Sequence, residues 1–225
     1  MIPLIHDFDG EVVLVFGGGA VGARKARRFG HEARVLVVSP TFADADFDGS
    51  ELVRAAPAPD DVPSWLAAAD PALVVAATDD ETLNAAIERH AHEAGVLVNR
   101  ADRAGDRDRG SVVVPATVED GPVGVAVTTG GTSPAVSRHL RRELEPVIGG
   151  AGLVATVVSE LRGELKEREP EADTRREAVR TVAANPDVWA AARAGDEERV
   201  REVAERVVAA ALDGGWSWNG EKRKR

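Results

Sequence analysis

Apolar residues form short blocks along the first hundred positions, and helical patterns separate these blocks. Continuous apolar runs of this length are typical of strands that are buried on both faces of a parallel sheet. They occur at residues 12–16, 35–38, 73–77 and 96–98, and Leu52-Val53 adds a shorter one. Residues 21–31 and the segment after Glu81 have apolar side chains at one-face helical spacing. The alternation predicts an α/β domain built on a doubly wound parallel sheet.

The pattern changes after Asn99. Two short strand candidates, Ser111–Pro115 and Val123–Thr128, flank a turn at residues 120–122 and predict a small second unit. Ser133 as N-cap and Pro134 as first helical residue predict the start of a helical region, which Pro170 and Asn185-Pro186 interrupt. Its apolar stripes are Val136, Leu140, Leu144 and Val147; Leu153, Val157, Leu161 and Leu165; and Val200, Val203, Ala204, Val207, Val208, Ala211 and Leu212.

These patterns divide the chain into expected domains. We expect a nucleotide-binding domain over 1–112, a dimerisation unit over 113–149, a helical domain over 150–216 and a disordered basic tail over 217–225. The short middle strands and the apolar stripe from Val136 to Val147 have little chain around them to cover them. The prediction is therefore a homodimer.

Composition narrows the function classes. The 225 residues include 44% hydrophobic side chains, which is enough for a sizeable core, and no apolar run approaches the roughly 18 residues of a membrane span. A net charge of −10 disfavours binding to nucleic acid or to anionic membranes. The absence of cysteine excludes disulfides, thiolate metal sites and cysteine nucleophiles. With no export signal visible, we expect a soluble cytoplasmic protein.

A glycine motif, Gly17-x-Gly19-x-x-Gly22, joins the first apolar run to the first helical pattern. In such a motif the first glycine permits a tight turn, the second lets the backbone approach a pyrophosphate, and the third lets helix and strand pack closely. The helix N-terminus also directs N–H groups and the positive end of its dipole at the anion. The motif predicts a dinucleotide cofactor; a glycine-rich turn that serves packing alone is the alternative.

The second strand ends in Ser39, Pro40 and Thr41 and lacks the acid that usually holds the adenosine ribose. Ribose contacts must then come from backbone groups or from the two hydroxyls, and the choice between NAD and NADP stays open. Arg24 and Lys25 either reach a cofactor phosphate or face solvent.

Two further strands end in polar residues at the edge where ligands bind in open α/β folds. Thr78, Asp79, Asp80 and Glu81 follow one strand; they form a capping box for the next helix, and such a turn can also line the cofactor cleft. Asn99 and Asp102 follow the last strand. Asp102 is a candidate general base, with a solvated loop aspartate as the alternative.

Arginines gather beside Asp102 in an otherwise acidic protein. This cluster suggests a polycarboxylate or phosphate ligand, and pairing with the neighbouring aspartates is the competing explanation. Its members are Arg100, Arg103, Arg107 and Arg109. A second glycine turn, with Thr129, Gly130 and Gly131, precedes a helix and is another candidate anion-binding site. The five histidines show no metal-ligand spacing, so a metal site is not assigned.

Five segments resemble, in order and spacing, the siroheme synthase dehydrogenase family of precorrin-2 dehydrogenases, some of which are also sirohydrochlorin ferrochelatases. They are Val15-Phe-Gly-Gly-Gly-Ala-Val-Gly-Ala-Arg-Lys25, Ala76-Ala-Thr-Asp-Asp80, Val98-Asn-Arg-Ala-Asp102, Val114-Pro-Ala116 and Val125-Ala-Val-Thr-Thr-Gly-Gly-Thr-Ser-Pro134. The similarity is specific from Leu4 to Leu144, and the helical tail to Trp216 is similar to the family's C-terminal region. We expect no uroporphyrinogen methyltransferase domain after it.

The resemblance implies a Rossmann-type domain, a dimerisation unit and a helical domain, with NAD-dependent oxidation of precorrin-2 to sirohydrochlorin and, in bifunctional members, iron insertion. It makes Asp102 the acid/base. It places Ala20 and Val21 on the pyrophosphate and Ser39, Pro40 and Thr41 around the adenosine. Together with the motifs above, the expected cofactor residues are Gly17, Gly19, Ala20, Val21, Gly22, Ser39, Pro40, Thr41, Thr78, Asp79 and Asn99. The arginine cluster and the second glycine turn give the expected substrate residues, which are Arg100, Arg103, Arg107, Thr129, Gly130 and Gly131.

The chain departs from the family in two places. Arg100 and Arg103 stand where small or acidic residues are common, and Gly110-Ser111-Val112 replaces a stretch that often includes an aromatic residue. Both departures concern the wall that would face a porphyrinoid and therefore bear on chelatase activity. A regulatory module that senses NAD without catalysis is the alternative function, because fold by itself does not exclude it.

Overall fold

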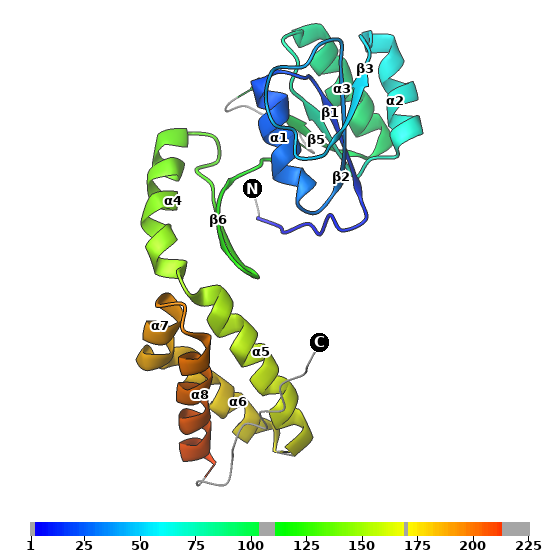
Figure 1. The fold of residues 1–225 in the computed structure, drawn as a ribbon. Coiled ribbons are helices and arrows are strands. Elements are labelled where there is room, and N and C mark those ends of the chain that lie inside the picture. Colours follow the sequence, from blue (N-terminus) through cyan, green and yellow to red (C-terminus); the bar gives the residue numbers. More distant parts are fainter. Residues whose placement is uncertain (1–2, 104–110, 169–170, 213–225) are drawn as a thin grey trace. The chain divides into compact units, whose positions relative to one another are not determined.

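The computed structural model describes residues 3–103, 111–168 and 171–212 (Figure 1). The chain forms two compact units, of which the first comprises residues 1–114 with 130–133 and the second comprises residues 115–129 with 134–225. The hairpin, the helix after it and the following helices thus share one unit. The expected boundaries at 112/113 and 149/150 remain predictions.

The first unit is built on one five-stranded parallel sheet in the order β3-β2-β1-β4-β5. Its elements are β1 (Val12–Phe16), α1 (Ala20–Gly30), β2 (Arg34–Ser39), β3 (Glu51–Arg54), the 3-10 turn η1 (Pro59–Asp61), α2 (Val62–Ala69), β4 (Leu73–Ala76), α3 (Glu81–Ala94) and β5 (Leu97–Arg100). All five expected strands are confirmed. The prediction lacks α2, because Val62 and Leu66 are its only buried side chains and give too short an apolar stripe to read as a helix.

Helices cover both faces of this sheet, so alternate residues of the central strands enter two different cores. Val13 and Val15 of β1 pack with α1, whereas Leu14 and Phe16 pack with side chains of α2 and α3 (Figure 1). The strand order reverses at β1, since β2 lies on one side of it and β4 on the other. In open α/β sheets the crevice at such a reversal is where ligands bind.

The second unit begins with an antiparallel hairpin of β6 (Ala116–Asp120) and β7 (Val123–Val127). The strand expected over Val123–Thr128 is confirmed, but the one expected over Ser111–Pro115 is wrong. The backbone of Ser111 forms an isolated parallel bridge to Val98, and Val112 and Val114 pack against the core of the first unit. The valine run is therefore a packed edge of the parallel sheet, and the hairpin starts beyond Pro115.

Among the described residues, five helices follow the hairpin: α4 (Pro134–Ile148), α5 (Ala151–Arg168), α6 (Ala172–Ala184), α7 (Pro186–Arg193) and α8 (Glu197–Ala211). The expected start at Pro134 and the break at Asn185-Pro186 are confirmed. The apolar stripes of α5 and α8 meet α6 and α7 in a core that includes Val157, Leu161, Leu165, Val182, Val188, Val200, Val203, Ala204 and Val208.

The stripe on α4 is only partly covered. Leu144 packs with Val118, whereas Val136, Leu140 and Val147 are 47%, 43% and 60% exposed. Among the described helices no single one is long and apolar enough to cross a membrane, although α4 and α5, bent by 48° at their junction, pass on length and composition when taken together.

Candidate functional site

The glycine loop between β1 and α1 is tightly packed at two of its glycines. Gly17 has a φ of +116°, and its N–H donates to the Val38 carbonyl oxygen at 3.0 Å. A Cβ at Gly17 would collide with the Ala77 carbonyl oxygen, and one at Gly22 would collide with the Gly17 carbonyl oxygen. The loop therefore brings the ends of β1 and β4 and the start of α1 closer together than a side chain would allow.

Gly19 differs from these two glycines because it is exposed and its φ of −77° is open to any residue. A Cβ built there meets no heavy atom within 4 Å, so the backbone borders open space. Gly19 is the N-cap of α1, and no side chain caps that helix. Ala20 and Val21 form the first turn, where backbone N–H groups and the dipole favour an anion. A pyrophosphate fits this geometry, and a side chain would fill its place.

Gly18 is a residue that the sequence reasoning missed. A Cβ there would collide with the Thr41 carbonyl oxygen, and the Gly18 carbonyl accepts a hydrogen bond of 2.8 Å from Ala43 N. The segment from Ser39 to Thr41 is thereby held against the glycine loop, with Ser39 buried and Pro40 and Thr41 exposed. The sequence did carry a signal for Gly18: it occupies the variable position between Gly17 and Gly19, where the motif does not require a glycine.

Arg54, at the end of β3, is a second residue that the motif did not reveal. Its Nη1 donates to the Pro40 carbonyl at 3.1 Å, and its guanidinium lies 5.7 Å from the centre of the Phe42 ring. The parallel register places Arg54 beside Ser39. The Arg54 guanidinium thus stabilises the turn after Ser39, where we expect the adenosine to lie.

Lys25 and Asn99 meet across the sheet. Lys25 Nζ donates to Asn99 Oδ1 at 2.8 Å, and Asn99 Nδ2 donates to the Val112 carbonyl at 2.8 Å. Of the two basic residues considered for a cofactor phosphate, Arg24 is exposed, and Lys25 is half-buried and bonded to the sheet. Asn99 is only 3% exposed, and its side chain links α1, β5 and the segment at Val112.

The turn after β4 is capped by a different residue from the one expected. Asp80 is the N-cap of α3, and its Oδ1 accepts from Thr82 N at 2.8 Å and from Leu83 N at 3.1 Å. The expected Thr78–Glu81 capping box is wrong, because Glu81 is already the first helical residue. Thr78 instead donates its hydroxyl to Asn84 Oδ1 at 2.7 Å, while Asp79 is exposed.

Asp102 lies just beyond β5 and is held by two neighbours. Arg100 Nε donates to Asp102 Oδ1 at 2.8 Å and Arg100 Nη2 to Oδ2 at 2.6 Å, while Asn84 Nδ2 reaches Oδ2 at 3.3 Å. The hydrogen bonds from Arg100 are the main reason that the pKa of Asp102 lies below its usual value, against the opposing effect of burial. The side chain is 26% exposed, so this oriented carboxylate still reaches solvent.

The two described arginines of the expected cluster differ in their surroundings. The Arg100 side chain is 3% exposed, and its remaining nitrogen Nη1 donates to Glu88 Oε2 at 2.9 Å. The protein's own carboxylates thus occupy Arg100, which argues against the expected direct role in substrate binding. Arg103 is 42% exposed, with Nη2 3.5 Å from Glu81 Oε1. Arg107 and Arg109 lie outside the described residues.

The second glycine turn has its own local geometry. Gly130 and Gly131 have φ values of +64° and +89°, which favour glycine, and the hydroxyls of Thr129 and Ser137 lie 3.3 Å apart. Thr129 belongs to the second unit and the two glycines to the first. Their expected role in substrate binding remains a prediction.

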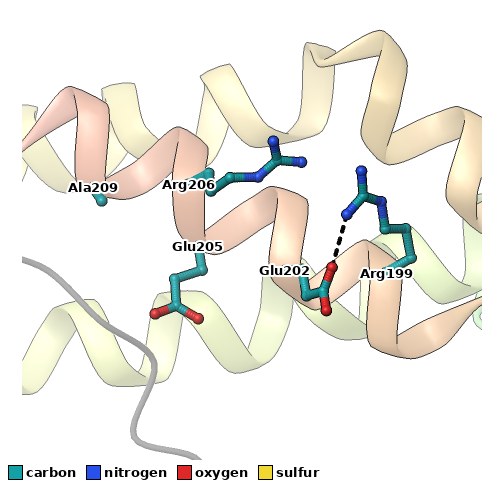
Figure 2. Close-up of a pocket in the computed structure, with 5 residues that line it drawn as sticks. All are labelled: Arg199, Glu202, Glu205, Arg206 and Ala209. Atoms are coloured by element: carbon teal, nitrogen blue, oxygen red, sulfur yellow. Dashed lines mark hydrogen bonds and ion pairs between the residues drawn. The ribbon is translucent and has the colours of Figure 1, made fainter.

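Two hollows lie elsewhere on the described part of the chain. One lies along α8, where Arg199 points at Glu202 and donates to it at 2.8 Å; its other lining residues are Glu205, Arg206 and Ala209 (Figure 2). Another lies at the amino edge of β2 and β3, around Arg34 and Glu51. Within the described ranges no three His, Cys, Asp or Glu side chains are grouped to hold a metal ion.

Two family models match the chain. A model of NAD(P)-binding domains matches residues 4–116, which include the whole parallel sheet. A model of the central region of sirohaem biosynthesis proteins matches residues 120–145, which include β7 and most of α4.

Similar proteins of known name extend over most of the chain. A precorrin-2 dehydrogenase of Methanosarcina barkeri is 33% identical over 226 residues, covering 92% of each chain. Siroheme synthases of Pseudomonas paraeruginosa and Stutzerimonas stutzeri are 37% and 34% identical and are matched over 78% and 93% of this chain. The chain spans only 37% and 45% of the length of those two synthases.

A solved structure shares the fold. The structure of SirC, a precorrin-2 dehydrogenase, has a TM-score of 0.68 and 20% sequence identity, with 92% of this chain and all of that chain covered. At this identity the likeness establishes the architecture: a five-stranded parallel sheet, a hairpin and a helical region.

Proposed function

The chain belongs to the siroheme synthase dehydrogenase family, and we propose that it oxidises precorrin-2 to sirohydrochlorin with NAD as cofactor. The reaction removes one hydride and one proton from the tetrapyrrole. The observation that carries the proposal is an open glycine loop and an oriented carboxylate at the same edge of one parallel sheet. A relative from Methanosarcina barkeri that is named a precorrin-2 dehydrogenase and is matched over 92% of both chains supports it.

The cofactor residues are proposed from the geometry of the crevice. The first turn of α1, with Gly19, Ala20 and Val21, would hold the pyrophosphate through backbone N–H groups. Ser39, Pro40 and Thr41 would surround the adenosine through backbone groups and hydroxyls, because this turn lacks an acid for the ribose. When bound, NAD supplies the hydride acceptor.

Asp102 is the proposed acid/base. It follows β5 at the carboxyl edge of the sheet, and its carboxylate is both oriented and accessible. In this role a carboxylate oxygen of Asp102 takes the proton that leaves the substrate as the hydride departs. Exposed Arg103, and Arg107 outside the described residues, would bind carboxylates of the substrate.

Iron insertion into sirohydrochlorin is a second candidate activity. Metal insertion requires a base that removes protons from pyrrole nitrogens, and an accessible ionised carboxylate such as Asp102 is suited to that step as well. We therefore propose that one aspartate would serve both reactions.

We further propose that the chain acts as a homodimer. Val136, Leu140 and Val147 are about half exposed on α4, and a second copy would cover them.

The deciding experiment is anaerobic incubation of the full chain with enzymatically made precorrin-2 and NAD, followed by the absorption spectrum of sirohydrochlorin. We expect oxidation by the parent, and an Asp102→Ala chain should bind NAD normally but turn over about 10²- to 10⁴-fold more slowly. Binding of NAD without oxidation by the parent would favour the NAD-sensing alternative. Oxidation by Asp102→Ala at the parental rate would remove the acid/base assignment.

A further inference from the structure

Arg100 and Asp102 form an ion pair whose geometry is unusually constrained. The guanidinium faces the carboxylate side-on, with Nε bonded to one oxygen at 2.8 Å and Nη2 to the other at 2.6 Å. Paired hydrogen bonds of this kind fix the plane of the carboxylate as well as its distance. An exposed pair would contribute little, but Arg100 is 3% exposed and comes from the last position of β5.

The opposite side of the guanidinium is also bound to a carboxylate. Arg100 Nη1 donates to Glu88 Oε2 at 2.9 Å, and Glu88 is itself only 8% exposed. Ser111 Oγ donates to the other Glu88 oxygen at 3.1 Å. A buried arginine needs such partners, because an unpaired buried charge costs several kcal/mol. Glu88, on α3, therefore fixes Arg100 against the sheet.

We propose that Arg100 is a positioning residue for Asp102: anchored by buried Glu88, it holds the aspartate as an oriented carboxylate at the substrate edge. This inference rests on the proposed function for its catalytic meaning, and it replaces the expected role of Arg100 in substrate binding. The Asn84 amide adds a third contact to Asp102 at 3.3 Å. Asn84 is itself fixed, because its Nδ2 also donates to the Thr78 carbonyl at 2.9 Å.

Arg100 favours ionisation of Asp102, and the nearby carboxylates are paired with arginines. Glu88 of α3 is bonded to Arg100 and lies 3.9 Å from Arg103 of the following loop, and Glu81 of α3 lies 3.5 Å from Arg103. The Arg100 hydrogen bonds lower the pKa of Asp102. A base works when it is ionised, so a lowered pKa extends activity to lower pH. Loss of Arg100 should move the acid limb of the activity profile to higher pH.

The test uses a double variant, Glu88→Gln with Arg100→Met, because the single change Arg100→Met would leave the buried Glu88 carboxylate with only the Ser111 hydroxyl and the more distant Arg103, 3.9 Å away. The glutamine introduced at position 88 can still accept from Ser111, and Met has a similar length to the arginine stem. Arg100→Lys keeps the positive charge but lacks the paired N–H donors that bind both oxygens of a carboxylate. Arg34→Met is the matched control, since Arg34 pairs with Glu51 at 2.8 Å at the opposite edge of the sheet.

Two quantities are measured on the full-length proteins. One is the titration midpoint of Asp102, from ¹³C NMR with carboxyl-labelled aspartate and the resonance assigned by its loss in Asp102→Asn. The other is the pH profile of kcat/KM for precorrin-2, which reports ionisations of the free enzyme. Calorimetric titration with NAD checks that cofactor binding is retained.

In the double variant we expect the Asp102 midpoint to rise by about one pH unit or more, with the acid limb moving equally. We also expect kcat to fall about 10- to 100-fold, because the carboxylate loses its orientation. Arg100→Lys should lie between the parent and the double variant, and Arg34→Met should match the parent.

An unchanged Asp102 midpoint in the double variant overturns the inference. A midpoint that rises while the acid limb stays fixed supports the positioning by Arg100 and removes Asp102 from the proposed chemistry. If even the parent fails to oxidise precorrin-2, the proposed function falls, and the NMR midpoint alone still decides whether Arg100 controls Asp102.

Discussion

Gly19 provides the sharpest separation of cofactor binding from folding. Its φ of −77° and ψ of −176° suit an N-cap with any side chain, and a Cβ there meets nothing within 4 Å. Aspartate is a favoured N-cap and its charge complements the helix dipole, so Gly19→Asp should keep or raise stability by a few tenths to about 1 kcal/mol. The same carboxylate would lie where the cofactor pyrophosphate is expected.

The expected loss of binding follows from that position. Two like charges about 4 Å apart near a protein surface repel by about 4 kcal/mol, which corresponds to roughly a thousandfold in Kd. Steric exclusion adds to this effect. Gly19→Asn keeps the shape without the charge and should bind NAD with intermediate affinity.

Calorimetric titration with NAD and thermal unfolding measure the two effects separately. Gly163→Asp is the matched control: Gly163 lies in α5, and a Cβ there also meets nothing within 4 Å. The control should bind NAD like the parent. A folded Gly19→Asp chain with parental affinity would refute the reasoning, because the glycine loop would then be structural and the cofactor would bind elsewhere.

Three further predictions concern packing, substrate and assembly. Gly22→Ala should lower the free energy of unfolding by about 1 to 3 kcal/mol in denaturant titrations, since its Cβ would collide with the Gly17 carbonyl; unaltered stability would contradict this. Arg103→Gln should raise KM for precorrin-2 with little change in kcat, because a contact made equally in the ground and transition states affects binding alone. Arg107→Gln should behave in the same way. A fall in kcat without a rise in KM would contradict the binding role of these arginines. Light scattering at micromolar concentration should give a dimer mass for the parent and a monomer mass for Leu140→Glu, which places a charge on a 43% exposed apolar position; a monomeric parent would exclude the proposed assembly.

The sequence predicted the turn at the glycine loop because strand, glycines and helix are contiguous. The positive φ of Gly17 and the close approach of Gly22 to the Gly17 carbonyl are both found, whereas the contact between Gly17 and the Ala77 carbonyl is a tertiary one. Predictions based on local pattern alone were wrong at two places where tertiary contacts determine the local structure. The apolar run after Ser111 packs against the parallel sheet, and Asp80 takes the capping position expected of Thr78.

The sequence by itself determined the parallel α/β sheet, the helical region and the edge of the sheet where Asp102 would lie, because the hydrophobic period and the alternation of strands and helices can be read from consecutive residues. Only the tertiary structure decided what surrounds Asp102. Glu88 and Asn84 come from α3, and the β4–β5 register places Arg100 beside Ala76, so the partners of the aspartate are set by how α3 packs on the sheet. Lys25 likewise finds Asn99 across 74 residues. Side chains so distant in sequence leave no periodic signal, and their pairing appears only when the helices cover the sheet.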